Sequence, residues 1–282
     1  MPFDLVDAMS VAADPAKPNE DAFAAETNDA AVLDGATGLG EMLLPGPSDA
    51  AWIAHFAARR LLAHRRDGEA PKEALRLALA DAEKSFAGLR WRPPKDTWEI
   101  PFASMMFVSA TEGGFGALWF GDCAALVLRT GEDVEIVGEA FDKRAAEAQR
   151  VKMMAEAKGL APAGGVSRAE FLPLLRAARN KVNTRAGGWL LSPDPRAADH
   201  AASKRVAAPP GTLILLATDG FLALASDYDA YSAQGLAEAV RDKGLRTLSE
   251  ELRALEDGDA EGRRFPRLKK SDDATAVLLR VT

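Results

Sequence analysis

The chain has 282 residues, of which 48% are hydrophobic and 27% are charged, a composition that is ordinary for a globular protein. Its net charge of -7 excludes the basic surface of a typical nucleic-acid-binding protein. The single cysteine, Cys123, excludes an internal disulfide and a thiolate zinc cluster. No apolar run approaches the roughly 20 residues of a membrane span, and residues 1–7 lack a signal-peptide pattern. We therefore expect a cytoplasmic protein with neither a membrane nor a nucleic-acid partner.

The first half of the chain combines short apolar segments with two longer helical patterns. Residues 3–12 and 30–33 are predicted strands. Two helices are predicted over 48–66 and 71–89, because Ser48 or Asp49 can cap the first, Pro71 can begin the second and apolar residues recur at helical spacing. Four short strands separated by glycine turns follow, as in antiparallel hairpins: residues 104–111, 115–121, 124–129 and 134–137.

The second half has fewer strands and more helices. Two buried strands, 212–218 and 274–281, enclose helical patterns over 234–243 and 245–257. Clusters of strands separated from pairs of helices indicate a layered α+β fold and not a doubly wound sheet. With neither a repeat nor a linker, residues 1–282 are predicted to form one domain. Three further segments are predicted as a helix, a flexible loop and a second helix: 141–158, 159–167 and 168–181. The strongly charged stretch 256–270 is predicted to be a solvated loop.

Aspartates stand beside the ends of several predicted strands. Hard divalent cations prefer several oxygen ligands, and glycine beside a carboxylate lets the backbone approach closely. A single Asp-Gly pair is typical of a turn, but the repetition favours a cation site. The motifs are NED at 19–21, VLDG at 32–35, FGD at 120–122, ATDG at 217–220 and SDDA at 271–274.

These segments resemble, in the same order, the motifs of the type 2C family, the metal-dependent PPM-type protein serine/threonine phosphatases. The similarity spans nearly the whole chain. Residues 187–200, GGWLLSPDPRAADH, are similar to a bacterial branch of that family. The matching segments are NEDA at 19–22, VLDGATG at 32–38, FASMMFVSA at 102–110, FGDCAALVLR at 120–129, LILLATDGF at 213–221 and SDDATAVLLRV at 271–281.

The resemblance implies a four-layer α-β-β-α sandwich, in which two antiparallel sheets are flanked by helix pairs. It also implies two divalent cations, Mg²⁺ or Mn²⁺, at one end of the sandwich. Asp34 would bridge the two cations and the Gly35 carbonyl would bind one of them, which makes Asp34 and Asp219 the expected catalytic residues. The remaining implied ligands are Asp21, Asp219 and Asp272, partly through water, and Asp122 for a third, weaker cation.

The implied reaction is hydrolysis of phosphomonoesters, with phosphoserine or phosphothreonine on a protein of unknown identity as the substrate, and hence a role in signalling. A hydroxide that bridges the two metals would attack phosphorus in line. The implied mechanism has no phosphoenzyme intermediate and therefore needs no Ser or Cys nucleophile. Cys123 is accordingly expected to be an ordinary buried residue of a hairpin.

Two departures from the family pattern keep an alternative open. The family usually has an Arg shortly before the NED motif, where it binds the substrate phosphate, but residues 13–18 contain no Arg. Lys17 is the candidate phosphate-binding residue in its place, although its ammonium is a point charge and lacks the two-pronged hydrogen bonding of a guanidinium. Ala36 stands where many members carry a His that can act as a general acid, so substrates with poor leaving groups would react slowly. The alternative is a catalytically weak or inactive phosphatase-like regulatory or binding module. Retention of clustered, mutually repelling aspartates favours the enzyme.

Other hydrolase and nucleotide-binding motifs fit less well. A haloacid-dehalogenase phosphatase needs Asp-x-Asp-Gly-Thr, and Val32 occupies the position of the first Asp. The sequence contains neither the G-x-x-x-x-G-K-[ST] loop of P-loop proteins nor the G-x-S-x-G turn of serine hydrolases.

Overall fold

The computed structural model describes residues 1–139, 141, 168–265, 267 and 269–282. Apart from Phe141, the predicted helix 141–158 and the predicted loop 159–167 lie outside the described residues. The second predicted helix of that region is observed as α4 (Arg168–Arg179).

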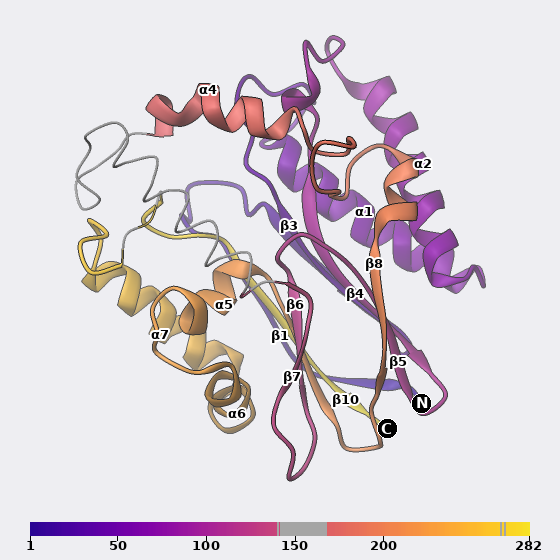
Figure 1. Ribbon diagram of the computed structural model, residues 1–282, viewed down its shortest axis with the longest axis vertical. Coiled ribbons are helices and arrows are strands. Elements are labelled where there is room, and N and C mark those ends of the chain that lie inside the picture. The colour runs from indigo at the N-terminus through magenta and orange to yellow at the C-terminus, as the bar shows by residue number, and fades with distance from the viewer. Residues whose placement is uncertain (140, 142–167, 266, 268) are drawn as a thin grey trace.

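Two antiparallel five-stranded sheets lie face to face between two layers of helices (Figure 1). The first sheet has the order β1-β10-β9-β6-β7, with bounds Phe3–Val11, Ala274–Val281, Leu213–Ala217, Ala124–Leu128 and Glu135–Val137. The second sheet has the order β2-β3-β4-β5-β8, with bounds Asp21–Ala25, Asp29–Gly35, Ala103–Thr111, Gly114–Phe120 and Ala202–Ala207. The predicted α-β-β-α sandwich is confirmed.

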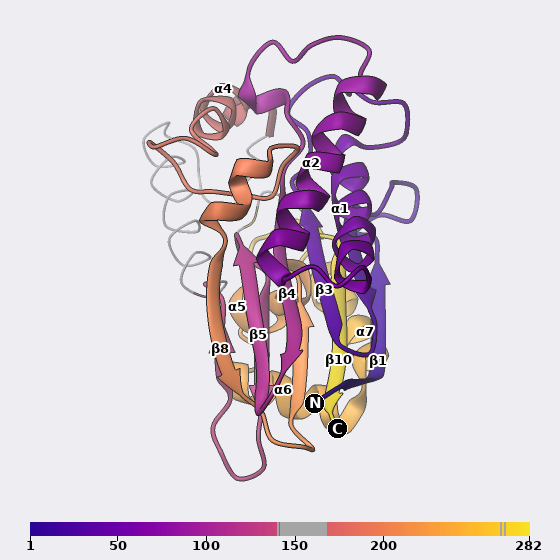
Figure 2. The ribbon, with the colours of Figure 1, turned by 90° about the vertical axis from the view of Figure 1, so that its right-hand side faces the viewer.

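Each sheet has helices on its outer face, as Figures 1 and 2 show from two sides. The second sheet is covered by α1 (Asp49–Arg66) and α2 (Pro71–Leu89), whose predicted bounds are confirmed, with Ser48 as the N-cap of α1. The first sheet is covered by the three helices that follow β9 and precede β10. They are α5 (Asp219–Ser226), α6 (Ala233–Lys243) and α7 (Leu245–Gly258).

Successive residues of the central strands belong to different layers of the core. In β3, Leu33 packs under α1 and α2, whereas Val32 packs between the two sheets. In β9, Leu216 packs between the sheets and Leu215 packs under the helices that cover the first sheet. Because successive side chains of a strand point to opposite faces, a strand that is covered on both faces needs a continuous apolar run. This is why β3 and β9 could be recognised in the sequence.

Two strands and one α-helix were not predicted. Strand β2 starts at Asp21 and is mostly alanine, and β8 is an edge strand with two exposed cations, Lys204 and Arg205. Neither has the apolar pattern of a buried strand. Helix α5 begins at Asp219, at a pair that local statistics assign to a turn. The short 3₁₀ helices η1 (Thr97–Glu99) and η2 (Pro195–His200) complete the described elements.

The prediction of a solvated loop over 256–270 is wrong for several of its residues. The side chain of Glu256 is only 3% exposed and pairs with Arg253. Arg267 pairs with Asp259 at 2.9 Å, and both side chains are largely buried. These ion pairs neutralise the charges that the sequence pattern assigned to solvent. Within the described part of the chain, no helix has the length and apolar character needed to cross a membrane.

Candidate metal centre

Three predicted ligands meet at one end of the sandwich. Asp34 is the penultimate residue of β3, Asp122 is two residues beyond β5, and Asp219 is the first residue of α5, two residues beyond β9. Each contributes a carboxylate oxygen, and these oxygens all lie within 4.8 Å of one another. The antiparallel order of the two sheets brings these positions to the same end.

Asp21 adds a fourth carboxylate beside the first three. It is the register partner of Asp34 across β2 and β3, and it is only 1% exposed. Its Oδ2 accepts a hydrogen bond of 2.8 Å from the hydroxyl of Thr218. No described residue donates to its Oδ1. A buried carboxylate oxygen without a donor is costly, and a bound cation would remove that cost.

The electrostatics of the cluster favour a cation as well. Burial raises the pKa of Asp34 well above its ordinary value, and the charges of Asp219, Asp21, Asp122 and Asp272 add to the rise. Burial also raises the pKa of Asp21 to about 7, against the lowering effect of its hydrogen bond from Thr218. The carboxylates therefore do not all ionise easily in the absence of positive charge. A set of donors made only of carboxylate oxygens suits hard cations such as Mg²⁺ and Mn²⁺.

The glycines after two of these aspartates are required by packing. A Cβ at Gly35 would lie 2.6 Å from the carbonyl oxygens of both Ala50 and Glu20, and a Cβ at Gly220 would lie 1.9 Å from the carbonyl oxygen of Asp273. The Gly35 amide also donates to the Glu20 carbonyl at 3.1 Å. In both Asp-Gly pairs, the glycine therefore packs against the backbone of another segment so closely that any side chain would clash. The role of the Gly35 carbonyl as a ligand stays a prediction.

Asp272 lies beside this group, and Lys17 is placed differently. Asp272 precedes β10, and its charge contributes to the raised pKa of both Asp34 and Asp21. Lys17 has a 76% exposed side chain that forms an ion pair of 3.6 Å with Asp14. Among the described contacts, none connects Lys17 with the clustered aspartates.

A lysine that the sequence did not single out adjoins the site. The Nζ of Lys269 donates to Oδ1 of Asp272 at 2.8 Å. Partial burial lowers the pKa of Lys269, but the charge of Asp272 and its hydrogen bond, together with the charges of Asp34 and Asp219, outweigh this effect and raise it. Lys269 is therefore a cation at the edge of the carboxylate cluster.

Glu20 is a second residue that the sequence analysis missed, although it belongs to the NED motif. Its carboxylate accepts hydrogen bonds from the hydroxyls of Thr37 and Ser48, and its amide donates to Asp273 at 2.6 Å. Because its carbonyl also accepts from Gly35, Glu20 joins the start of β2 to the loop after β3, the start of α1 and the segment before β10.

Two neighbours of Asp122 have distinct roles. Ser104, at the start of β4, donates its hydroxyl to Oδ1 of Asp122 at 2.6 Å and so fixes that carboxylate. Cys123 is fully buried, and burial followed by the charge of Asp34 raises the pKa of its thiol well above the ordinary value. A protonated, buried thiol is a poor nucleophile, in agreement with the expected structural role of Cys123.

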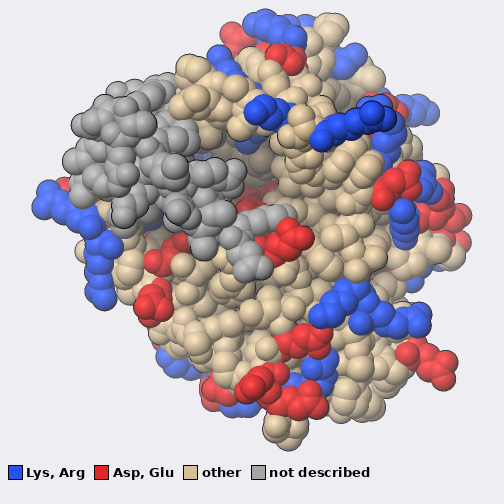
Figure 3. All heavy atoms as spheres, viewed as in Figure 1, with Lys and Arg blue, Asp and Glu red and all other residues tan. Residues whose placement is uncertain are grey.

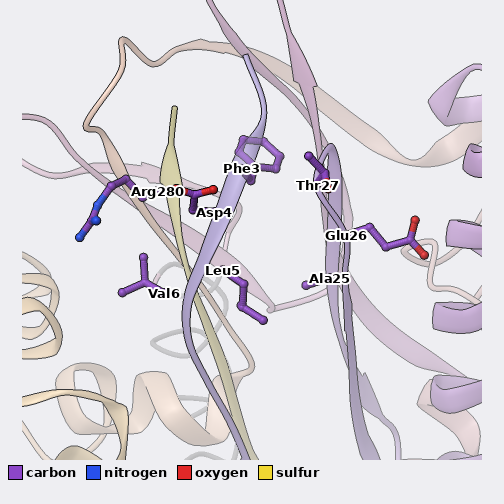
Figure 4. Close-up of a pocket in the computed structure, with 8 residues that line it drawn as sticks. All are labelled: Phe3, Asp4, Leu5, Val6, Ala25, Glu26, Thr27 and Arg280. Carbon is purple, nitrogen blue, oxygen red and sulfur yellow. The ribbon is translucent and has the colours of Figure 1, made fainter.

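The face viewed in Figure 3 has a recess in its upper half, with Asp or Glu atoms at the floor. A separate hollow of about 510 Å³ lies between the start of β1 and the end of β2, around Phe3, Thr27 and Arg280 (Figure 4). The register pairs Phe3 with Val281 and Ala25 with Ala30, so this hollow is at the opposite end of the strands from Asp34. It is not part of the carboxylate site.

Comparison with solved structures identifies the fold. The catalytic domain of the serine/threonine protein phosphatase PstP in complex with two manganese ions matches 100% of this chain and 99% of its own, with 16% identity and a TM-score of 0.57. The Mycobacterium tuberculosis phosphatase PstP/Ppp matches with the same coverage and identity and a TM-score of 0.59. The PPM Ser-Thr phosphatase MsPP from Mycobacterium smegmatis, in complex with cacodylate, matches 99% of both chains with 17% identity and a TM-score of 0.55.

Sequence comparisons give no such match. No protein-family model matches the chain, and no curated protein matches it either. The likeness is therefore one of architecture over the full length of both chains. On that evidence the chain has the fold of the PPM-type serine/threonine phosphatases.

Proposed function

We propose that this protein is a metal-dependent phosphatase that hydrolyses phosphomonoesters, with phosphoserine and phosphothreonine of proteins as its substrates. One observation carries the proposal: the oxygens of Asp34, Asp122 and Asp219 converge within 4.8 Å at one end of a PPM-type fold. The fold alone would not assign an activity, but the same fold with a carboxylate cluster that fits divalent cations does support one.

The proposed cofactors are two divalent cations, Mn²⁺ or Mg²⁺, as in the manganese complex of PstP. Asp34 would be shared between them, and the Gly35 carbonyl would bind one. Asp21, Asp219 and Asp272 would complete the ligand set, and Asp122 would hold a third, weaker cation. Such cations supply a Lewis acid that acidifies water and offsets charge on the phosphoryl oxygens.

The protein's own part in this chemistry is to hold carboxylates rigidly. Thr218 orients Asp21 and Ser104 orients Asp122 through hydrogen bonds of 2.8 and 2.6 Å. Gly35 and Gly220 let the backbone pass close enough to bring the strand ends together. Such support is what keeps ligand geometry fixed. Since Ala36 supplies no proton donor, aryl phosphates should be hydrolysed faster than phosphoserine.

The test is hydrolysis of p-nitrophenyl phosphate by the full chain with EDTA or with millimolar Mn²⁺, beside Asp34→Asn. Turnover that requires the metal and is lost in the variant would support the proposal. A phosphoserine peptide assayed in parallel tests the substrate class. Mn²⁺ binding by calorimetry without turnover on either substrate would instead favour the phosphatase-like binding module, which the missing Arg and Ala36 also favour.

A further inference from the structure

Lys269 places a cation beside Asp272, one of the proposed metal ligands. Its Nζ lies 2.8 Å from Oδ1 of Asp272, and the negative charges of Asp272, Asp34 and Asp219 help to raise the pKa of Lys269. The lysine and Asp272 are three residues apart in the segment that leads into β10. The ammonium therefore contacts Asp272, one of the proposed metal ligands.

The side chain of Lys269 is also open to a ligand. It is 40% exposed, and that of Asp272 is 34% exposed. An ammonium group has three N–H donors. Within the described part of the chain, one of these donors is used in the hydrogen bond to Asp272. The other two N–H groups are available to another acceptor.

The charges of the proposed ligands and cations favour a positive side chain at the position of Lys269. Asp21, Asp34, Asp122, Asp219 and Asp272 carry five negative charges when all are ionised, and two divalent cations would supply four positive charges. When the weaker third position at Asp122 is empty, the positive charge of Lys269 makes this set of charges neutral before a phosphate dianion binds. If Asp272 turned its oxygens to a cation, the ammonium of Lys269 could donate its N–H groups to another anion.

On this basis we propose that Lys269 binds the phosphoryl group of the substrate and takes the place of the arginine that is missing before the NED motif. The inference rests on the proposed phosphatase activity. It assigns phosphate binding to Lys269 in preference to Lys17, whose exposed side chain pairs with Asp14.

Calorimetric titration of inorganic phosphate into the Mn²⁺-loaded full chain tests this assignment. Lys269→Met keeps the length of the side chain but removes its charge, and it should weaken phosphate binding about 10- to 100-fold, as expected for a lost hydrogen bond to a charged group. Lys269→Arg restores the charge and should recover most of the affinity.

The chain offers two matched controls. Lys270 is the next residue, and its Nζ pairs with Asp257 at 2.6 Å. Lys270→Met and Lys17→Met should both bind phosphate like the wild type. Titration of Mn²⁺ without phosphate provides a second readout, in which Lys269→Met should bind the metal at least as well as the wild type, because a competing cation has been removed.

Three outcomes would overturn the inference: unchanged phosphate affinity in Lys269→Met, an equal loss in Lys17→Met, or a loss that weaker Mn²⁺ binding explains. If the wild type hydrolyses p-nitrophenyl phosphate with Mn²⁺ and Lys269→Met binds phosphate normally, only the role of Lys269 is contradicted. A wild-type protein that neither binds phosphate nor turns over contradicts the phosphatase proposal and the inference together.

Discussion

Asp21 and Asp34 lie directly opposite each other on the neighbouring strands β2 and β3. Like charges in such a cross-strand pair repel, and burial in a region of low dielectric strengthens the repulsion. The pair is tolerated because the pKa of each carboxyl is raised, and a bound cation would relieve the repulsion in another way. The stability of the protein should therefore depend on both pH and metal.

The first prediction concerns the metal-free protein. The pKa of Asp21 is raised from 3.8 to about 7, so between these values the folded chain holds a proton that the unfolded chain has lost. The stabilisation that this bound proton gives to the folded state is complete below pH 3.8 and is lost as pH rises through about 7. The loss removes at most on the order of 4 kcal/mol from the free energy of unfolding. Melting temperatures measured in EDTA should fall from pH 5 to pH 8.

Mn²⁺ should reverse this trend, because cation binding requires ionised carboxylates and stabilises only the folded state. The rise in melting temperature on adding Mn²⁺ should be larger at pH 8 than at pH 5. Asp21→Asn should flatten the metal-free profile. A metal-free melting temperature that climbs steadily over this range in the wild type would contradict the assignment.

The second prediction concerns Asp34→Asn and Asp219→Asn. Each should reduce Mn²⁺-dependent turnover by more than the about 10- to 100-fold typical of a residue that only supports a ligand. Asp34→Asn should also melt at a higher temperature than the wild type in EDTA at pH 8, because it removes a charge that burial and its neighbours disfavour. The assays are p-nitrophenyl phosphate hydrolysis and thermal melting. Asp242→Asn, at an exposed ion pair with Arg241, is the control.

The third prediction concerns Thr218, whose fully buried hydroxyl donates to Asp21. Thr218→Val keeps the shape but leaves Asp21 without this donor, so Mn²⁺ affinity should fall about 10-fold and the metal-free protein should lose about 1–3 kcal/mol of stability. Thr218→Ser should restore both. Calorimetry with Mn²⁺ and urea denaturation measure the two effects, and equal affinities in the valine and serine variants would rule out a role for the hydroxyl.

The fourth prediction concerns glycines. Gly35→Ala and Gly220→Ala each place a Cβ against a carbonyl oxygen, and each should cost about 1–3 kcal/mol or more in urea denaturation, the range for overpacking. Gly88→Ala is the matched control, because it lies in α2 with open space around its Cβ. It should stabilise the protein by about 0.5–1 kcal/mol. A neutral Gly220→Ala would argue against the close passage of the segment before β10.

The sequence was most informative where its signals are local. Helices α1 and α2 were predicted with nearly correct ends, since helical periodicity and the residues at Ser48 and Pro71 are sufficient to define them. The buried strands β9 and β10 were found for a similar reason. In contrast, β8 is held by pairing with β5, and a partner more than eighty residues away leaves no pattern in an exposed, charged segment.

The candidate site divides in the same way. The sequence by itself determined that aspartates stand at strand ends and that the chain has a layered α+β fold, because hydrophobic periodicity and Asp-Gly pairs are properties of neighbouring residues. The sandwich of two sheets was implied by the family resemblance. The resemblance implied that Asp21, Asp34, Asp122 and Asp219 share one site, but only the tertiary structure shows that they meet. It alone also shows that Lys269 contacts Asp272 while Lys17 is exposed and pairs with Asp14. Convergence and burial depend on which strands pair across the chain, and burial in turn sets the pKa of each carboxyl.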